Sequence, residues 1–123
     1  MHKSRLAGFI IDCHTTDLDG AAQFWSGALG LPLKPQAEAA YRVFDTGAEG
    51  LHIEVQQVEH PSRVHLDIET DDVEAEVQRL EKLGAQRLQK LRTWWVMQAP
   101  SGQRFCVVRP QRADFATEAN TWD

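Results

Sequence analysis

Histidine and acidic side chains alternate with apolar ones in three separate stretches, residues 9–15, 51–56 and 63–69. Within each stretch the polar residues share one parity and the apolar residues share the other. Imidazole and carboxylate groups orient polar ligands and bind divalent metals, so their convergence would build a binding site. The side chains on the polar parity are Asp12, His14, His52, Glu54, His65 and Asp67.

Alternation of this kind predicts β-strands with one face against helices and one polar face. A further strand over 105–108 places Phe105 on the apolar face and Arg104 and Cys106 on the polar one. Trp94 and Trp95 are adjacent, so one of them must point to the polar face. An aromatic wall beside titratable groups is typical of a ligand pocket. We therefore expect Trp94, Trp95 and Arg104 to join the six polar residues in binding a ligand.

The elements that carry these residues form an internal repeat. Two helical patterns run from Asp17 to Gly30 and from Asp71 to Gly84, and they lie 54 positions apart. Asp17 and Asp71 are expected as N-caps, and the two glycines as left-handed C-caps. Around each helix the pattern predicts a strand before and three short strands after it, a βαβββ unit. The predicted strands cover 9–15, 31–33, 41–44, 51–56, 63–69, 86–88, 94–97 and 105–108.

The repeat divides the chain into unit one at about 6–57, unit two at about 62–109, and a polar tail at 110–123. A chain of 123 residues matches one domain of ordinary size. Beyond Pro110 we expect a loosely held segment, which Phe115 and Trp122 can dock.

Composition narrows the classes of partner. The formal charge is −5, the pI is about 5.5, and no run of Lys or Arg occurs, which argues against nucleic acid and anionic membranes. No apolar stretch is long enough to span a bilayer. Two distant cysteines, Cys13 and Cys106, fit a reducing compartment. We expect a cytoplasmic protein that binds a small molecule or a protein.

Two long motifs resemble one family: DLDGAAQFWSGALGLP from Asp17 and HLDIETDDVEAEVQRLEKLGA from His65. Together with the two βαβββ units, they are similar to the vicinal oxygen chelate superfamily. That group includes glyoxalase I, bleomycin-resistance proteins and extradiol dioxygenases, and its small glyoxalase-like domains are the nearest in appearance. The resemblance covers about residues 6–109. It implies an α+β fold with a curved, cup-shaped mixed sheet, helices on the outer face, and a homodimer.

Metal-dependent members of the superfamily hold the ion with four residues inside the cup. At the corresponding positions this sequence has Ile10, Glu54, His65 and Cys106, or Val108 in place of Cys106 if the register shifts. Only Glu54 and His65 match the ligands that the resemblance implies. Two protein ligands rarely hold a divalent metal tightly. The implied cofactor is therefore either none or a divalent metal such as zinc, nickel, manganese or iron.

Three functions stay open at this point. The first is a cup without the full metal site that binds a small polar aromatic molecule through Trp94 or Trp95, His65, Glu54 and Arg104. The second is a metal-dependent lyase, isomerase or dioxygenase in which His14 or His52 completes a rearranged shell around Glu54 and His65. The third is a non-catalytic dimeric interaction module with a vestigial cup.

A simpler interpretation competes with all three, because antiparallel sheets often expose one polar face. His2 and His60 lie in terminal and loop positions and are expected to have no role. Cys106 is expected to be a small strand residue rather than a nucleophile, since only Arg104 offers it a positive neighbour.

Overall fold

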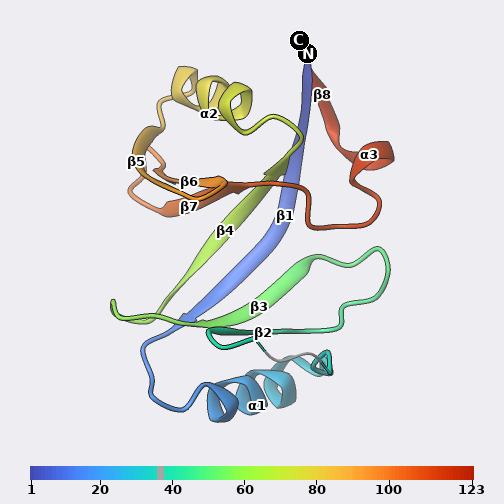
Figure 1. Ribbon diagram of the computed structural model, residues 1–123, viewed down its shortest axis with the longest axis vertical. Helices are drawn as coiled ribbons and strands as arrows, with labels where there is room; N and C mark the ends of the chain where they lie inside the picture. The colour runs from blue at the N-terminus through green and yellow to red at the C-terminus, as the bar shows by residue number, and fades with distance from the viewer. Residues whose placement is uncertain (36–37) are drawn as a thin grey trace.

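The computed structural model describes residues 1–35 and 38–123. Its elements are β1 (His2–Cys13), α1 (Leu18–Leu29), β2 (Tyr41–Val43), β3 (His52–Gln57), β4 (Arg63–Thr70), α2 (Val73–Lys82), β5 (Gln86–Leu91), β6 (Trp94–Gln98), β7 (Arg104–Val108), α3 (Phe115–Glu118) and β8 (Asn120–Trp122). They form an open, curled mixed sheet with strand order β2-β3-β1-β4-β7-β6-β5, and β8 pairs with β1. The α+β prediction is confirmed. Figure 1 shows α1 and α2 at opposite ends of the molecule.

The repeated topology is visible in the pairing of the strands. β3 returns after α1 to lie parallel to β1, and β7 returns after α2 to lie parallel to β4. Antiparallel pairing of β1 with β4 joins the two halves into one sheet. The first half has one strand fewer than predicted. Residues 31–33, expected to form a strand, contribute only an isolated bridge between Leu33 and Phe44.

The helix caps agree with the prediction in the first half and differ in the second. Asp17 accepts a hydrogen bond from the Gly20 amide at 2.9 Å, and Gly30 is left-handed with φ of 69°. At α2 the N-cap is Asp72, whose carboxylate accepts from the Ala75 amide at 3.1 Å. The predicted cap Asp71 instead accepts from the Lys3 amide. The C-cap is Leu83, and the predicted glycine, Gly84, follows it with the expected positive φ, 107°.

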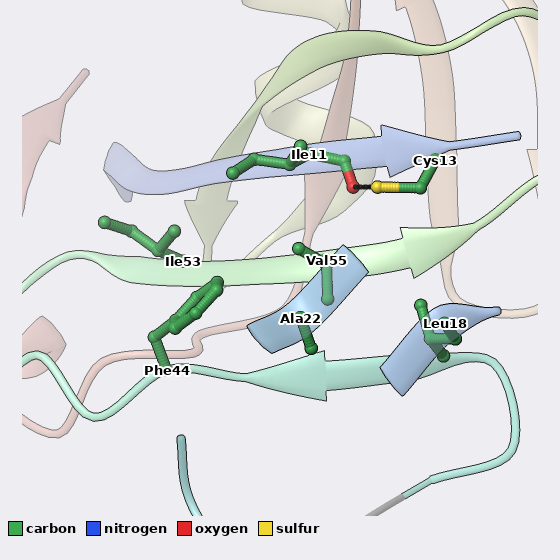
Figure 2. Packing of buried hydrophobic residues seen from close by; sticks show 7 residues of the cluster. All are labelled: Ile11, Cys13, Leu18, Ala22, Phe44, Ile53 and Val55. Carbon is green, nitrogen blue, oxygen red and sulfur yellow. Dashed lines mark hydrogen bonds between the residues drawn. The ribbon is translucent and has the colours of Figure 1, made fainter. Parts of the chain in front are cut away.

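Each helix covers its own apolar core. Figure 2 shows the first core, which α1 closes against β1 and β3; its buried residues are Ile11, Cys13, Leu18, Ala22, Phe44, Ile53 and Val55. The second core lies under α2 and contains Val77, Leu80, Met97, Phe105 and Val107. The strand parity assigned from the sequence is confirmed for β1, β3 and β7. On β4 only Ile68 packs against a core. Val64 and Leu66, expected to lie under a helix, are exposed, because α1 and α2 lie at opposite ends of the molecule and leave this part of β4 uncovered (Figure 1). Within residues 1–35 and 38–123, no helix is both long and apolar enough to cross a bilayer.

The centre of the sheet depends on a close backbone approach at Gly8. This residue pairs with His52 on β3 and lies at a register shift against β4. A Cβ atom built on Gly8 would lie 1.8 Å from the backbone oxygen of His52. No other residue type fits there without moving one of the two strands.

The end of the chain is docked through the two predicted residues, Phe115 and Trp122, and it is therefore held more firmly than the loose segment that we expected. Phe115 is buried, and β8 pairs with the first residues of β1, so that the two termini lie side by side (Figure 1). Trp122 donates from Nε1 to Ser4 Oγ at 2.8 Å, and the Arg79 guanidinium lies 3.9 Å from the centre of its ring system. β1 therefore begins at His2 rather than at the predicted residue 9, because this pairing extends it.

His2 was expected to have no role, and the structure gives it a structural one. Its imidazole is buried and lies 2.7 Å from the carboxylate of Glu76. Glu76 is fully buried in α2 and also receives two hydrogen bonds from Arg79. Burial raises the pKa of Glu76, but the bonds from Arg79, His2 and Ser4 outweigh it and hold the pKa below the usual value. The contact between His2 and Glu76 therefore holds the first residues of β1 against α2.

Candidate functional site

A cavity of about 560 Å³ opens on the polar face of the sheet. Side chains from all seven strands β1 to β7 line it, together with residues of the connecting loops. The lining residues are Ile10, Asp12, Tyr41, Glu54, Gln56, Val58, His60, Arg63, His65, Asp67, Gln89, Leu91, Thr93, Trp94, Val96, Arg104, Phe105, Cys106, Val108, Arg109 and Gln111.

Strand register decides which of these side chains are neighbours. On β1, Ile10 pairs with Glu54 of β3 on one side and with His65 of β4 on the other. On the far side of β4, Asp67 pairs with Cys106 of β7. Because paired residues on one face have adjacent side chains, the register brings His65, Asp67 and Cys106 together.

His65 is the most strongly perturbed group of the cavity. Its Nδ1 donates to Oδ2 of the buried Asp12 at 2.7 Å, and its Nε2 lies 3.5 Å from Asp67 Oδ1. Burial disfavours the charged imidazolium, but the contacts with Asp12, Asp67 and Cys106 outweigh it and raise the pKa of His65 to about 11. In the metal-free protein, His65 is therefore a cation at neutral pH.

Two carboxylate oxygens beside His65 lack partners. Among the residues that the structure describes, neither Asp12 Oδ1 nor Asp67 Oδ1 has a well-formed hydrogen bond, although both atoms are buried and Asp67 Oδ1 lies 3.5 Å from the charged His65 ring. Buried unpaired oxygens are costly and are uncommon in folded proteins. One donor atom each from His65, Asp67 and Cys106 lies within 4.8 Å of the others.

The structure places six of the nine predicted ligand-binding residues in the cavity and three outside it. Asp12, Glu54, His65, Asp67, Trp94 and Arg104 line the cavity, and so do Ile10 and Cys106.

Three predicted residues lie outside the cavity: His14, His52 and Trp95. His14 is exposed, because β1 ends at Cys13 and the alternation ends with it; its amide donates to Ser62 Oγ. His52 starts β3 and places its Nε2 2.8 Å from Glu54 Oε1. Trp95 has the opposite parity to Trp94, so it packs against the second core, with Arg87 at 5.1 Å from its ring.

Four charged or aromatic lining residues were missed by the sequence analysis: Tyr41, His60, Arg63 and Arg109. Arg63 shares its parity with His65 and Asp67, so the alternation in the sequence already predicted that it lies on the polar face. His60 lies in a loop without periodicity and was expected to have no role. Its Nε2 lies 4.0 Å from Asp12 Oδ2 and 3.3 Å from the Arg63 guanidinium. The place of His60 in the cavity follows only from the tertiary structure, which brings its loop to the cavity.

With the geometry in place, comparison with known proteins identifies the family. The family model described as a glyoxalase-like domain matches residues 8–108, most of the chain. This chain belongs to the glyoxalase-like domain family. The resemblance to the vicinal oxygen chelate superfamily is thereby confirmed. A search of curated proteins returned no match.

Solved structures share the fold of this glyoxalase-like domain at low sequence identity. A hypothetical protein from Bacillus halodurans C-125 aligns with a TM-score of 0.63 and 13% identity, covering 89% of this chain and 96% of its own. The Mn(II)-bound glyoxalase from Novosphingobium aromaticivorans aligns with a TM-score of 0.60 and 17% sequence identity. The alignment covers 92% of this chain and 44% of the glyoxalase. An extradiol ring-cleaving dioxygenase from B. fuscum aligns with a TM-score of 0.57 and 11% sequence identity. The alignment covers 87% of this chain and 32% of the dioxygenase. At these identities the likeness concerns the fold.

The four metal positions implied by the family can now be tested against the residues that occupy them. Ile10 has no donor atom, although it lies between Glu54 and His65. Glu54 bonds to His52, and it does not belong to the cluster of donors around His65. Cys106 offers a sulfur, but toward His65 and Asp67. The residues at the family's four positions therefore do not fit the family's metal shell.

Proposed function

We propose that this glyoxalase-like domain binds a small aromatic molecule with an anionic substituent in its cavity. The observation that carries the proposal is the lining, which combines the indole of Trp94 with arginines and a histidine cation around about 560 Å³. Cavities of a few hundred cubic ångströms suit ligands of this size.

The positively charged groups of the cavity favour an anionic substituent on the ligand. Two of the cavity's carboxylates already have partners, because Asp12 bonds to His65 and Glu54 bonds to His52. Arg104 and Arg109 extend into the same cavity with exposed side chains. A guanidinium group binds a carboxylate through two parallel hydrogen bonds, which favours a planar anionic substituent.

The apolar part of the lining favours an aromatic body. Leu91, Val96 and Val108 line the cavity together with Trp94. Aromatic rings stack on or against indole with a gain beyond that of buried area alone. Such a ligand would contact the indole with its ring and the arginines with its charged group.

Tryptophan fluorescence tests the proposal with a panel of aromatic carboxylates and phenols as probes. We expect a binding member to quench the emission, and Trp94→Phe to remove most of that quenching. Trp95→Phe is the matched control, because Trp95 lies outside the cavity and should leave the quenching intact. His65→Ala is expected to weaken binding at least tenfold while the protein stays folded. Quenching lost in Trp95→Phe but retained in Trp94→Phe would contradict the proposal.

A metal-dependent lyase, isomerase or dioxygenase is the second candidate. The donor atoms of His65, Asp67 and Cys106 favour it, because three protein ligands and one open position are typical of catalytic zinc sites. A bound divalent ion would supply Lewis-acid polarisation of a ligand oxygen. Turnover in a screen of these reaction types that disappears after chelation and returns with added metal would support this function; turnover unaffected by chelation would exclude it.

A further inference from the structure

A second cavity, of about 620 Å³, lies beside the first one at the turn between β5 and β6. Thr93 and Arg109 line both cavities, so the two cavities are neighbours. The four family metal positions and the donors around His65 are not among the residues that line the second cavity. Its lining residues are Thr70, Asp71, Asp72, Val73, Glu74, Lys90, Arg92, Thr93, Trp95, Arg109 and Pro110.

Three basic side chains of the second cavity are available to a ligand. Lys90 is on β5, Arg92 is in the turn that follows, and Arg109 comes directly after β7. All three residues are exposed. Within the part of the chain that the structure describes, their side chains take part in no hydrogen bond and no ion pair. Their positive charges are therefore not neutralised by direct contacts within that part of the chain.

The three carboxylates of the same cavity already have donors from this chain. Asp71 accepts from the Lys3 amide at 2.8 Å, and Asp72 is the N-cap of α2. Glu74 accepts from both terminal nitrogens of Arg87, at 2.9 and 2.6 Å. The bonds from Arg87 are the main reason that the pKa of Glu74 is lowered to about 2. The unpaired charge of the cavity is therefore positive and lies on the side of the β5–β6 turn.

The backbone at Arg92 supports a role for its side chain. Leu91 pairs with Trp94, so Arg92 and Thr93 form a two-residue hairpin turn. Arg92 has a φ of 31°, and it is the only non-glycine residue with a positive φ within residues 1–35 and 38–123. Such turn positions strongly favour Asn or Gly, because other side chains strain a left-handed backbone. The turn does not require an arginine, and strained residues of this kind cluster at functional sites.

We propose that the second cavity binds the phosphate group of a small molecule through Lys90, Arg92 and Arg109. Ammonium and guanidinium groups form charge-assisted hydrogen bonds with phosphate oxygens. A phosphate monoester carries about 1.5 to 2 negative charges at neutral pH on three strong acceptor oxygens, which suits three separate cations. The site does not rest on the aromatic ligand proposed above, because inorganic phosphate alone serves as the probe.

Calorimetric titration with inorganic phosphate at constant ionic strength tests the site. We expect one equivalent to bind, and Lys90→Gln and Arg109→Gln should each weaken binding at least tenfold. Lys82→Gln is the matched control, because Lys82 is an exposed lysine at the end of α2 outside the cavity. Arg104→Gln is the second control, because Arg104 lines only the first cavity. Both controls should leave the affinity unchanged.

Arg92→Asn separates binding from folding. We expect this variant to raise the urea concentration at the unfolding midpoint, because Asn adopts a positive φ more readily than Arg. The same variant should weaken phosphate binding at least tenfold, and a more stable protein cannot lose affinity through unfolding. Absence of one-equivalent binding in the unaltered protein would overturn the proposal. Unchanged affinity in Arg92→Asn, or an equal loss in Lys82→Gln, would overturn it as well.

Phenyl phosphate distinguishes a free anion from a phosphorylated aromatic ligand. This comparison alone rests on the proposed function, because it needs Trp94 in the neighbouring first cavity. Binding at least tenfold tighter than that of inorganic phosphate, with the gain lost in Trp94→Phe, would support one ligand that occupies both cavities. Equal affinities of the two probes, both lost in Lys90→Gln, would support a site for free phosphate.

Discussion

At the scale of single residues, His65 shows that neighbouring carboxylates can outweigh the effect of burial on the pKa of a histidine. A lone buried histidine loses its charge, yet this one lies between Asp12 and Asp67 and keeps it. The consequence is a positive charge in the floor of the cavity at neutral pH, because the pKa of His65 is raised to about 11. A bound cation would take the place of the proton on Nε2, because a metal ligand must release it.

This charge predicts a definite dependence of stability on pH. The pKa of His65 is about 11 in the folded protein against an ordinary value of 6.5. The group therefore stabilises the fold fully below pH 6.5, and this contribution is lost progressively as the pH rises toward 11. We expect the difference in unfolding free energy between the metal-free protein and His65→Gln to shrink steadily over that range, as measured by urea denaturation.

The control for this prediction is His14→Gln, which changes an exposed residue outside the cavity. It should alter the free energy of unfolding by less than about 0.5 kcal/mol. A difference between the protein and His65→Gln that stays constant or grows with pH would contradict the assignment of a raised pKa.

At the scale of elements, Gly8 decides how closely β1 approaches β3. Gly8→Ala is expected to lower the free energy of unfolding by about 1–3 kcal/mol or more, because the added methyl group meets the backbone of His52. Chemical denaturation measures this loss.

Gly27 provides the matched control on α1. It is exposed, and a Cβ built there meets nothing within 4 Å. Alanine favours helices over glycine, so Gly27→Ala should raise stability by about 0.5–1 kcal/mol. The same sign of change in both variants would refute the close approach at Gly8.

At the scale of the whole molecule, one buried carboxylate joins distant parts of the chain. Glu69 on β4 is fully buried, accepts from Arg5 Nε at 2.7 Å, and accepts from the amides of Gln111 and Arg112 at 2.6 and 2.9 Å. Arg112 in turn donates to the carbonyls of Leu6, Glu49 and Gly50. Glu69 thus ties the C-terminal segment to β1 and to the loop before β3.

Removing this carboxylate should destabilise the whole fold. Glu69→Ala leaves the largely buried Arg5 with Asp114 as its remaining acidic contact among the described residues, and it leaves two amides unpaired. The expected loss is about 3–5 kcal/mol, as measured by thermal and urea unfolding. Glu118→Ala, at an exposed residue of the same segment, should change stability by less than about 0.5 kcal/mol. Similar effects of the two substitutions would argue against this role of Glu69.

Much of the architecture follows from local patterns in the sequence. Alternation assigned both faces of β1, β3 and β7 and the polar face of β4, since side chains of a strand point alternately to its two sides. It did not show that Val64 and Leu66, on the other face of β4, are exposed. Asp17 and Gly30 bounded α1 because a cap depends only on residues within one turn. The cavity residues on these strands, Asp12, Glu54, His65, Asp67 and Arg104, were accordingly predictable one at a time.

What only the tertiary structure decided is which of those residues meet. Pairing between strands far apart in the chain sets Asp67 beside Cys106, and it leaves Glu54 with His52 instead of with His65. The contribution of His60 and the docking of β8 on β1 likewise arise from contacts between distant segments. A strand's own pattern fixes its faces but carries no information on its register against a distant partner, because register depends on both strands and on the turns that connect them.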